Sequence, residues 1–112
     1  MKAEGLPPSQ QNVFGESIEL CCCDPLTGFY RDGHCNTGPN DLGTHTVCAL
    51  MTDGFLEYSA AAGNDLSTPR PEFNFPGLVA GNRWCLCALR WEQARRAGKA
   101  PKLYLKATNI VT

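Results

Sequence analysis

Two runs of the chain are apolar at almost every position and predict buried strands. They cover residues 45–51 and 84–89. A strand that is covered on both faces has no polar side, so its sequence lacks the alternation typical of a half-exposed strand. A further strand is predicted over residues 103–107, and two short ones over 13–14 and 17–20.

Helices are predicted directly after the two apolar runs. Thr52 suits an N-cap, residues 53–62 follow with helix-compatible spacing, and Gly63 marks the end. Residues 90–97 are mostly good helix formers, and Gly98 ends them. Strands and helices that alternate in the second half, after a hairpin-like first half, predict an α+β fold. We expect a single small domain with a mixed β-sheet, two helices and long Gly/Pro-rich loops.

Two stretches rich in glycine and proline predict those loops. In the first, which covers residues 24–45, glycine recurs at every fifth position from 28 to 43, and this excludes a long helix. Within it, Asp32-Gly33 favours a hairpin turn, because both residues tolerate positive φ. The second covers residues 64–83. Loops of such length are uncommon in small domains and often carry function.

Composition narrows the classes of partner and location. The 112 residues include ten Lys and Arg against eleven Asp and Glu, a formal net charge of -1. Without a basic excess, nucleic acid is not an expected partner. No window is apolar enough for a membrane span or an export signal, so no membrane association is expected and a cytoplasmic location is predicted. The polar residues 1–11 predict a flexible N-terminal tail, and residues 12–112 a single globular domain.

The seven cysteines are unusual for a chain of this length. Without an export signal, and with an odd count, they are expected to be free thiols. The simplest interpretation is that they pack in the core as small apolar residues. A catalytic alternative takes Cys35 as a nucleophile with His45 as its base, and Asp41 or Asp65 orienting the imidazole ring.

A metal site is the second chemical alternative. Cys85 and Cys87 face the same side of a strand, and zinc prefers thiolate and imidazole ligands. No Cys-x-x-Cys pair occurs, so neither a metal nor another cofactor is the leading expectation. If a metal is bound, its ligands come from six residues: Cys21, Cys35, His45, Cys48, Cys85 and Cys87.

The long second loop favours a binding site for a small anion. The candidate ligand-binding residues are Asn64, Asp65, Thr68, Arg70 and Arg83. Two guanidinium groups can hold a carboxylate or a phosphate bidentately, although the same side chains can also satisfy the loop's own backbone. We expect the two loops to converge on a polar pocket for a small anionic ligand or substrate. Whether catalysis follows is left open.

Another interpretation is a non-catalytic module that binds a protein through Phe75, Pro76 and Leu78. These residues either anchor the second loop to the core or form a protruding apolar tip. A cysteine-rich core would then be purely structural.

Several short motifs, in order along the chain, resemble a mainly bacterial family known as domain of unknown function 2237. They are Asp24-Pro-Leu-Thr-Gly-Phe29, Cys35-Asn-Thr-Gly38, Asp41-Leu-Gly-Thr-His45, Gly63-Asn-Asp-Leu-Ser-Thr-Pro-Arg-Pro-Glu72, Phe75-Pro-Gly-Leu78 and Arg83-Trp-Cys-Leu-Cys87. The resemblance implies no activity or cofactor. This chain has His34 where the family pattern suggests a cysteine, and Cys22 and Cys23 are additional to it.

Overall fold

The computed structural model describes residues 10–112, and its centre is a two-stranded antiparallel sheet. Strand β1 (His45–Leu50) pairs with β2 (Arg83–Cys87), with Cys48 directly opposite Cys85. Both apolar runs therefore form strands as predicted, and the α+β class is confirmed. The expectation of a mixed sheet is wrong, because the two strands run antiparallel and no third strand joins them within residues 10–112.

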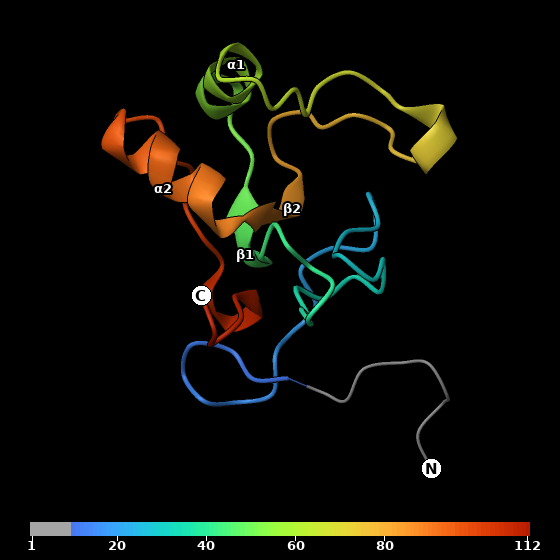
Figure 1. Cartoon of the computed structure of the whole chain (residues 1–112), viewed down its shortest axis with the longest axis vertical. Helices are drawn as coiled ribbons and strands as arrows, with labels where there is room; N and C mark the ends of the chain where they lie inside the picture. Colours follow the sequence, from blue (N-terminus) through green and yellow to red (C-terminus); the bar gives the residue numbers. More distant parts are fainter. Residues whose placement is uncertain (1–9) are drawn as a thin grey trace.

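Both predicted helices are present. Helix α1 (Asp53–Ala61) begins at Thr52, whose hydroxyl accepts a hydrogen bond from the Phe55 amide at 3.1 Å. Helix α2 (Ala88–Arg96) follows β2 without a break. Figure 1 shows both helices at one end of the molecule, with residues 10–44 toward the other. No helix of the described chain has the length and apolar character needed to cross a bilayer.

The two faces of the sheet pack against different layers. Val47 and Ala49 of β1 join Trp84 and Leu86 of β2 in a core shared with α1 and α2. The alternate residues Cys48 and Cys85 point into a second core, because successive side chains of a strand face opposite sides. The second core holds Ile18, Cys21, Cys35, Cys48, Cys85 and Ala107.

Residues 10–44 form neither a helix nor a strand. The strands predicted over 13–14 and 17–20 are wrong, since only isolated bridges occur there, Gln11 with Ser17 and Asn12 with Asn109. Side-chain hydrogen bonds take the place of the backbone hydrogen bonds of a sheet. Asn12 Oδ1 accepts hydrogen bonds from the backbone amides of Phe14 and Glu16.

The hairpin predicted at Asp32-Gly33 does not form either. Arg31 and Gly33 both adopt positive φ, 54° and 83°, so the chain turns twice where a strand would have to extend.

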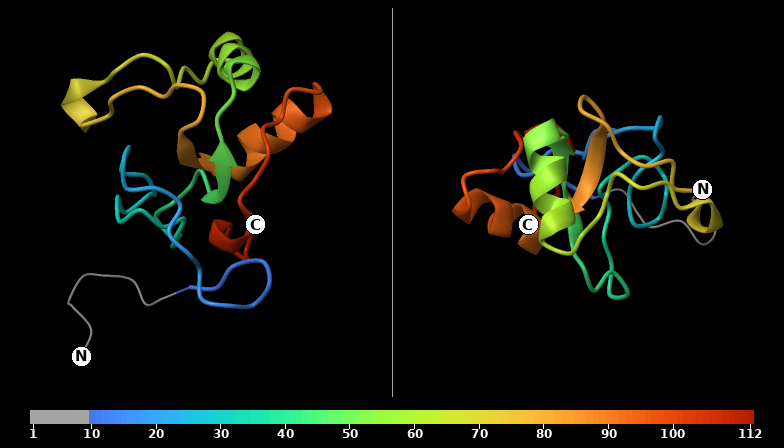
Figure 2. Two further views of the ribbon diagram at one scale, coloured as in Figure 1. Left: turned by 180° about the vertical axis from the view of Figure 1, so that it is seen from behind. Right: turned by 90° about the horizontal axis from the view of Figure 1, so that it is seen from above.

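The last predicted strand is also replaced by irregular structure. Leu103 makes one bridge to Ala49, and the chain then turns into the 3₁₀ helix η2 (Leu105–Ala107). In the second loop, the 3₁₀ helix η1 (Pro71–Phe73) is the only helical turn among residues 64–82. Figure 2 shows that this loop reaches out from α1 toward the side of the sheet where residues 24–44 lie.

The end of the predicted tail is held in place. Residues 1–9 lie outside the described part of the chain, but Gln10 donates a hydrogen bond to the Thr37 carbonyl at 2.7 Å and accepts one from Asn109 at 2.6 Å. The side chain of Gln10 therefore joins the start of the described chain to two distant parts of the fold.

Four of the seven cysteines are disulfide-bonded, which corrects the expectation of free thiols. Cys21 is bonded to Cys48 of β1, and Cys35 to Cys85 of β2. Cys22, Cys23 and Cys87 are free. The expectation rested on cellular compartment, whereas the pairing depends on which segments the fold brings to the second core. Both links join the irregular first half of the chain to the sheet.

Candidate functional site

A cavity of about 690 Å³ lies between the two long loops and ends on β2. The first loop contributes Gly28, Phe29 and Arg31, and the second contributes Asp65, Leu66, Arg70, Phe73 and Phe75. His45, Trp84 and Cys85 from the sheet complete the lining. A cavity of this volume is in the range that takes a small organic molecule.

Aromatic rings form most of the cavity's apolar wall. Phe75 meets Trp84 edge to face at 5.2 Å between ring centroids, and Phe29 stacks on the His45 ring at 6.3 Å. The guanidinium of Arg31 lies over Trp84, 5.1 Å from the ring centroid. These contacts hold a cation beside the aromatic wall of the cavity.

Two arginines give the cavity its positive charge. Neither Arg31 nor Arg70 forms an ion pair with another residue of the described chain. Arg31 donates one hydrogen bond to the Gly28 carbonyl at 2.6 Å, which leaves most of its donors unused. Both guanidinium groups therefore have donors available to a bound anion.

Asp65 is the acidic residue of the lining, and its own loop occupies its carboxylate. It accepts hydrogen bonds from the Thr68 hydroxyl at 2.6 Å and from the amides of Ser67 and Thr68. These bonds, with the Thr68 hydroxyl first, lower the pKa of Asp65, and the positive charge of Arg70 adds to the effect. Asp65 is thus an ionised turn residue that shapes the second loop.

His45 is held by Asp41. Asp41 Oδ1 lies 2.6 Å from His45 Nδ1. Asp41 Oδ2 accepts two further hydrogen bonds, one from the His45 amide and one from the Thr37 hydroxyl, both at 2.9 Å. Burial alone would raise the pKa of Asp41, but the hydrogen bonds from His45 and Thr37 outweigh it and lower the pKa. An ionised Asp41 can only accept, so Nδ1 carries the proton and Nε2 of the neutral ring is free to accept a hydrogen bond.

Gly43 makes room for this ring. A Cβ atom at position 43 would lie 2.5 Å from His45 Cε1, too close for a carbon contact. The absence of a side chain at Gly43 is therefore a condition for the position of the imidazole between Asp41 and the cavity.

Residues 11–112 match a family described as an uncharacterized protein conserved in bacteria, DUF2237. The chain belongs to this family. The match covers nearly the whole chain and confirms the resemblance seen in its motifs. No curated protein matches the chain. The function of DUF2237 proteins is not established, so the site has to be interpreted from its own geometry.

The cavity of this DUF2237 protein gathers part of the predicted ligand-binding set and His45 of the predicted catalytic set. His45, Asp65 and Arg70 line it, and Thr68 supports Asp65. Arg83 does not line it, because its guanidinium stacks on Tyr104, 4.5 Å from the ring centroid. Asn64 lines a smaller neighbouring cavity of about 210 Å³, which His45 shares.

The structure does not place Cys35 beside a base as a free thiol. Cys35 is fully buried, with 0% of its surface exposed, and its sulfur is bonded to Cys85. In this state it has no thiolate, so the predicted attack by Cys35 lacks its nucleophile. What reaches the cavity wall is Cys85, the other half of the disulfide.

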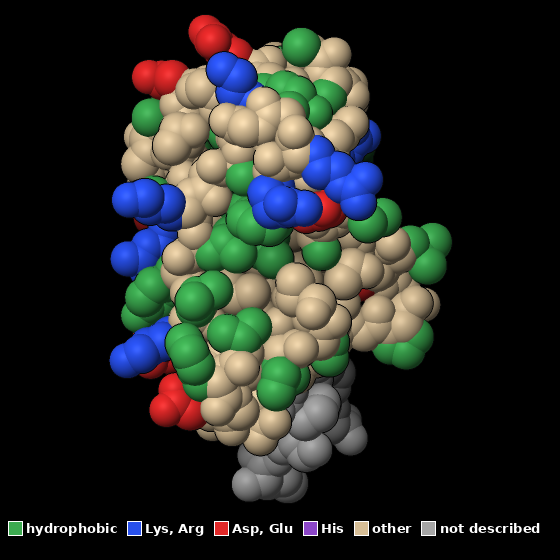
Figure 3. Space-filling model, turned by 90° about the vertical axis from the view of Figure 1, so that its left-hand side faces the viewer, with side chains coloured by type: hydrophobic (Ala, Val, Ile, Leu, Met, Phe, Trp, Pro, Cys, Tyr) green, Lys and Arg blue, Asp and Glu red, His purple; other side chains and the backbone are tan. Residues whose placement is uncertain are grey.

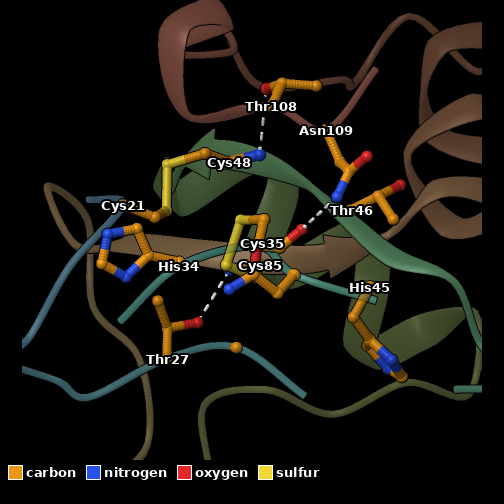
Figure 4. Close-up of a disulfide and its surroundings, with 12 residues drawn as sticks. Cys21, Thr27, His34, Cys35, His45, Thr46, Cys48, Cys85, Thr108 and Asn109 are labelled. Carbon is orange, nitrogen blue, oxygen red and sulfur yellow. Dashed lines mark hydrogen bonds between the residues drawn. A yellow bond between two sulfur atoms is a disulfide. The ribbon is translucent and has the colours of Figure 1, made fainter. Parts of the chain in front are cut away.

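The predicted metal ligands separate into two groups. Cys21, Cys35, Cys48 and Cys85 meet in the second core, as Figure 4 shows. His45 is bound to Asp41, and Cys87 lies opposite His45 at the end of the sheet.

The residues predicted to meet a protein partner mostly anchor the second loop. Leu78 is 1% exposed and belongs to the first core, and Phe75 packs on Trp84. Pro76 is exposed. A protruding tip that uses Leu78 is therefore not present.

The surface over α2 offers no broad basic tract. On the face shown in Figure 3, Lys and Arg side chains stand singly or in small groups among apolar and backbone atoms. Arg95 and Arg96 of α2 both bind Glu92, whose pKa these hydrogen bonds lower to about 2.

Six residues of the cavity lining were missed by sequence reasoning: Gly28, Phe29, Arg31, Leu66, Phe73 and Trp84. Phe29 and Arg31 lie in the glycine-punctuated loop, where two aromatic residues beside an arginine were a usable signal. Trp84 was assigned only to the core. Its ring does contact the core, but one side also forms the cavity wall.

Proposed function

We propose that the protein binds a small organic anion with a flat apolar body in the cavity between its two loops. The observation that carries this proposal is the pair of guanidinium groups, Arg31 and Arg70, that line an aromatic cavity without an acidic partner in the described chain. A guanidinium group that forms no ion pair favours an anionic ligand, and aromatic rings favour a planar one.

Each part of the wall has a separate role in this proposal. Arg70 and Arg31 bind the carboxylate or phosphate, while Phe29, Phe75 and Trp84 cover the apolar body. His45 Nε2 accepts a hydrogen bond from a hydroxyl or amino group of the ligand, because Asp41 keeps the proton on Nδ1. Phe73 lies at the open rim, where it is largely exposed.

The test uses phenyl phosphate as the probe, in titrations followed by calorimetry and by NMR shifts of the cavity residues. We expect phenyl phosphate to bind more tightly than inorganic phosphate, which offers only the anionic group, and more tightly than benzyl alcohol, which offers only the aromatic ring. Arg70→Met keeps the aliphatic stem and should weaken binding about 10- to 100-fold, as expected for losing a hydrogen bond to a charged group.

Arg83→Met is the matched control, because Arg83 lies on Tyr104 outside the cavity. It should leave the affinity unchanged. Equal effects of the two variants, or shifts confined to residues away from the cavity, would contradict the proposal.

A cytoplasmic location, expected from the sequence, stays a prediction. Since a reducing compartment opens most disulfides, rapid acid quenching of cells, followed by alkylation under denaturing conditions with a chelator and by mass measurement, tests it. Alkylation of all seven cysteines supports this location, whereas protection of four of them counts against it.

A further inference from the structure

The second core brings four cysteine sulfur atoms together from four separate segments. Cys21 and Cys35 come from the irregular first half, Cys48 from β1 and Cys85 from β2. The sulfur atoms of Cys21, Cys35 and Cys85 all lie within 4.8 Å of one another, and that of Cys48 is bonded to Cys21. None of the four residues is more than 3% exposed. Figure 4 shows the two disulfides side by side between the strands and the first loop.

We propose that these four cysteines form a zinc site when their disulfides are reduced. Structural zinc is held by four protein ligands in a closed, tetrahedral site, and thiolates are its favoured ligands. With zinc–sulfur bonds of about 2.3 Å, the sulfurs of such a tetrahedron lie about 3.8 Å apart. The sulfur of Cys21 lies within 4.8 Å of those of Cys35 and Cys85, which are bonded to each other. After reduction, rotation of the side chains would have to bring the four sulfurs to this spacing.

The reaction balances with a dithiol as the reductant. Each disulfide takes up two electrons and two protons, its sulfur–sulfur bond breaks, and the dithiol becomes a disulfide. The four thiols then lose four protons as their sulfurs bind one Zn²⁺. Exchange with two disulfide molecules reverses the sequence: zinc leaves, the two sulfur–sulfur bonds form again, and each oxidising disulfide becomes a dithiol.

The surroundings of the cluster favour a closed site. Thr27 is fully buried beside the cluster, and its hydroxyl oxygen accepts a hydrogen bond from the Cys85 amide at 2.8 Å. The hydroxyl proton of Thr27 has no acceptor among residues 10–112. That proton can be donated to a charged sulfur nearby. On the opposite side, the Thr108 hydroxyl accepts the Cys48 amide at 3.2 Å and fixes this part of β1. Both backbone positions are thereby held without the sulfur–sulfur bonds.

The irregular residues 10–44 need a cross-link to the sheet. Residues 10–44 contain no helix or strand, and both disulfides tie them to the sheet. Reduction without a metal removes both ties and leaves four buried thiols. A single zinc ion reconnects the same four segments, and its binding energy then stabilises the fold.

The test compares the full-length protein in its oxidised form and after anaerobic reduction with a phosphine. Co²⁺ is titrated as the optical probe and is then displaced by Zn²⁺. We expect one Co²⁺ per reduced chain, with the intense visible absorption of tetrahedral thiolate coordination, and no such band for the oxidised protein. If the reduced chain is unfolded before the titration, the metal should refold it, as measured by circular dichroism.

Two sets of variants locate the site. Cys22→Ser/Cys23→Ser/Cys87→Ser removes every cysteine outside the cluster and should keep the full Co²⁺ affinity. Cys48→Ser, measured in the same refolding titration, should lose more than about tenfold in affinity. The proposal is overturned if the reduced protein gains no tetrahedral band, or if the triple variant loses it. This result is independent of phenyl phosphate binding, since Arg70→Met leaves the cluster intact.

Discussion

Asp41 shows how one buried carboxylate can set the geometry of a cavity. Its side chain is fully buried, and it accepts three hydrogen bonds from residues within four positions of it. Two of the three come from His45, one from the backbone and one from the ring. The carboxylate therefore fixes both the start of β1 and the tautomer of the imidazole that faces the cavity.

We expect Asp41→Asn to destabilise the protein by about 1–3 kcal/mol at neutral pH, since hydrogen bonds to a charged group are weakened. The pKa of Asp41 is lower in the folded protein than its ordinary value of 3.8. Its ionised form is thus the stabilising one, fully present above that value and lost as the pH falls through the folded pKa.

Urea unfolding of wild type and Asp41→Asn at neutral pH and below pH 3.8 measures this difference. The gap in free energy should narrow in acid, because Asp41 of the wild type becomes neutral. A gap that stays constant with pH would show that the hydrogen-bond geometry alone, and not the charge, stabilises the site.

Among the elements, those with a local start and stop signal were predictable. Helix α1 has an N-cap hydroxyl at Thr52 and a glycine two residues after its end, at Gly63, where φ is 97°. The strands β1 and β2 had long apolar runs. In residues 10–44 the glycines were the only local signal. The conformation of this segment depends on contacts with residues far away in sequence, and the periodicity of apolar residues does not encode such contacts.

Thr52 provides the test at the scale of an element. Thr52→Ala leaves the first turn of α1 without its side-chain acceptor and should cost about 1 kcal/mol in the free energy of unfolding. Thr52→Ser keeps the hydroxyl and is the control. The midpoint of urea unfolding should fall for alanine and stay near wild type for serine, with an unchanged slope.

If both substitutions lower the midpoint equally, the cap is not the cause. The methyl group of Thr52 would then be the part of the side chain that matters.

In the whole molecule, two halves of different construction are joined through the sheet. Residues 45–101 carry both strands, both α-helices and the first core, whereas residues 10–44 rely on turns, side-chain hydrogen bonds and the second core. The convergence of the two loops was predictable from their length and polarity. The pairing of Cys21 with Cys48 and of Cys35 with Cys85 was not, since seven cysteines permit many combinations and sequence spacing selects none.

Replacing either cystine by two alanines should destabilise the oxidised protein by about 4 kcal/mol if loop-closure entropy dominates. The loops closed by the two links span 27 and 50 residues in sequence separation, and the longer one should matter more by only about 0.5 kcal/mol. Amide hydrogen exchange should accelerate in residues 10–44 and change less in β1, β2 and α1.

Cys22→Ala/Cys23→Ala is the control for this experiment, because both thiols are free. It should change neither stability nor exchange. A uniform loss of protection across the chain would instead indicate that the two halves unfold as one cooperative unit.

The first and last parts of the described chain are joined by hydrogen bonds, so the early part of a nascent chain cannot complete its fold before the late part is made. The amide of Asn109 donates to the Thr46 carbonyl at 2.9 Å, and its side chain donates to the Cys35 carbonyl at 3.0 Å. The Val13 amide donates to the Thr108 carbonyl at 3.0 Å. A ribosome delivers residues 10–35 long before these partners, so the early segment emerges with its buried polar groups unmatched. These hydrogen bonds can form only after residues 108 and 109 have been synthesised.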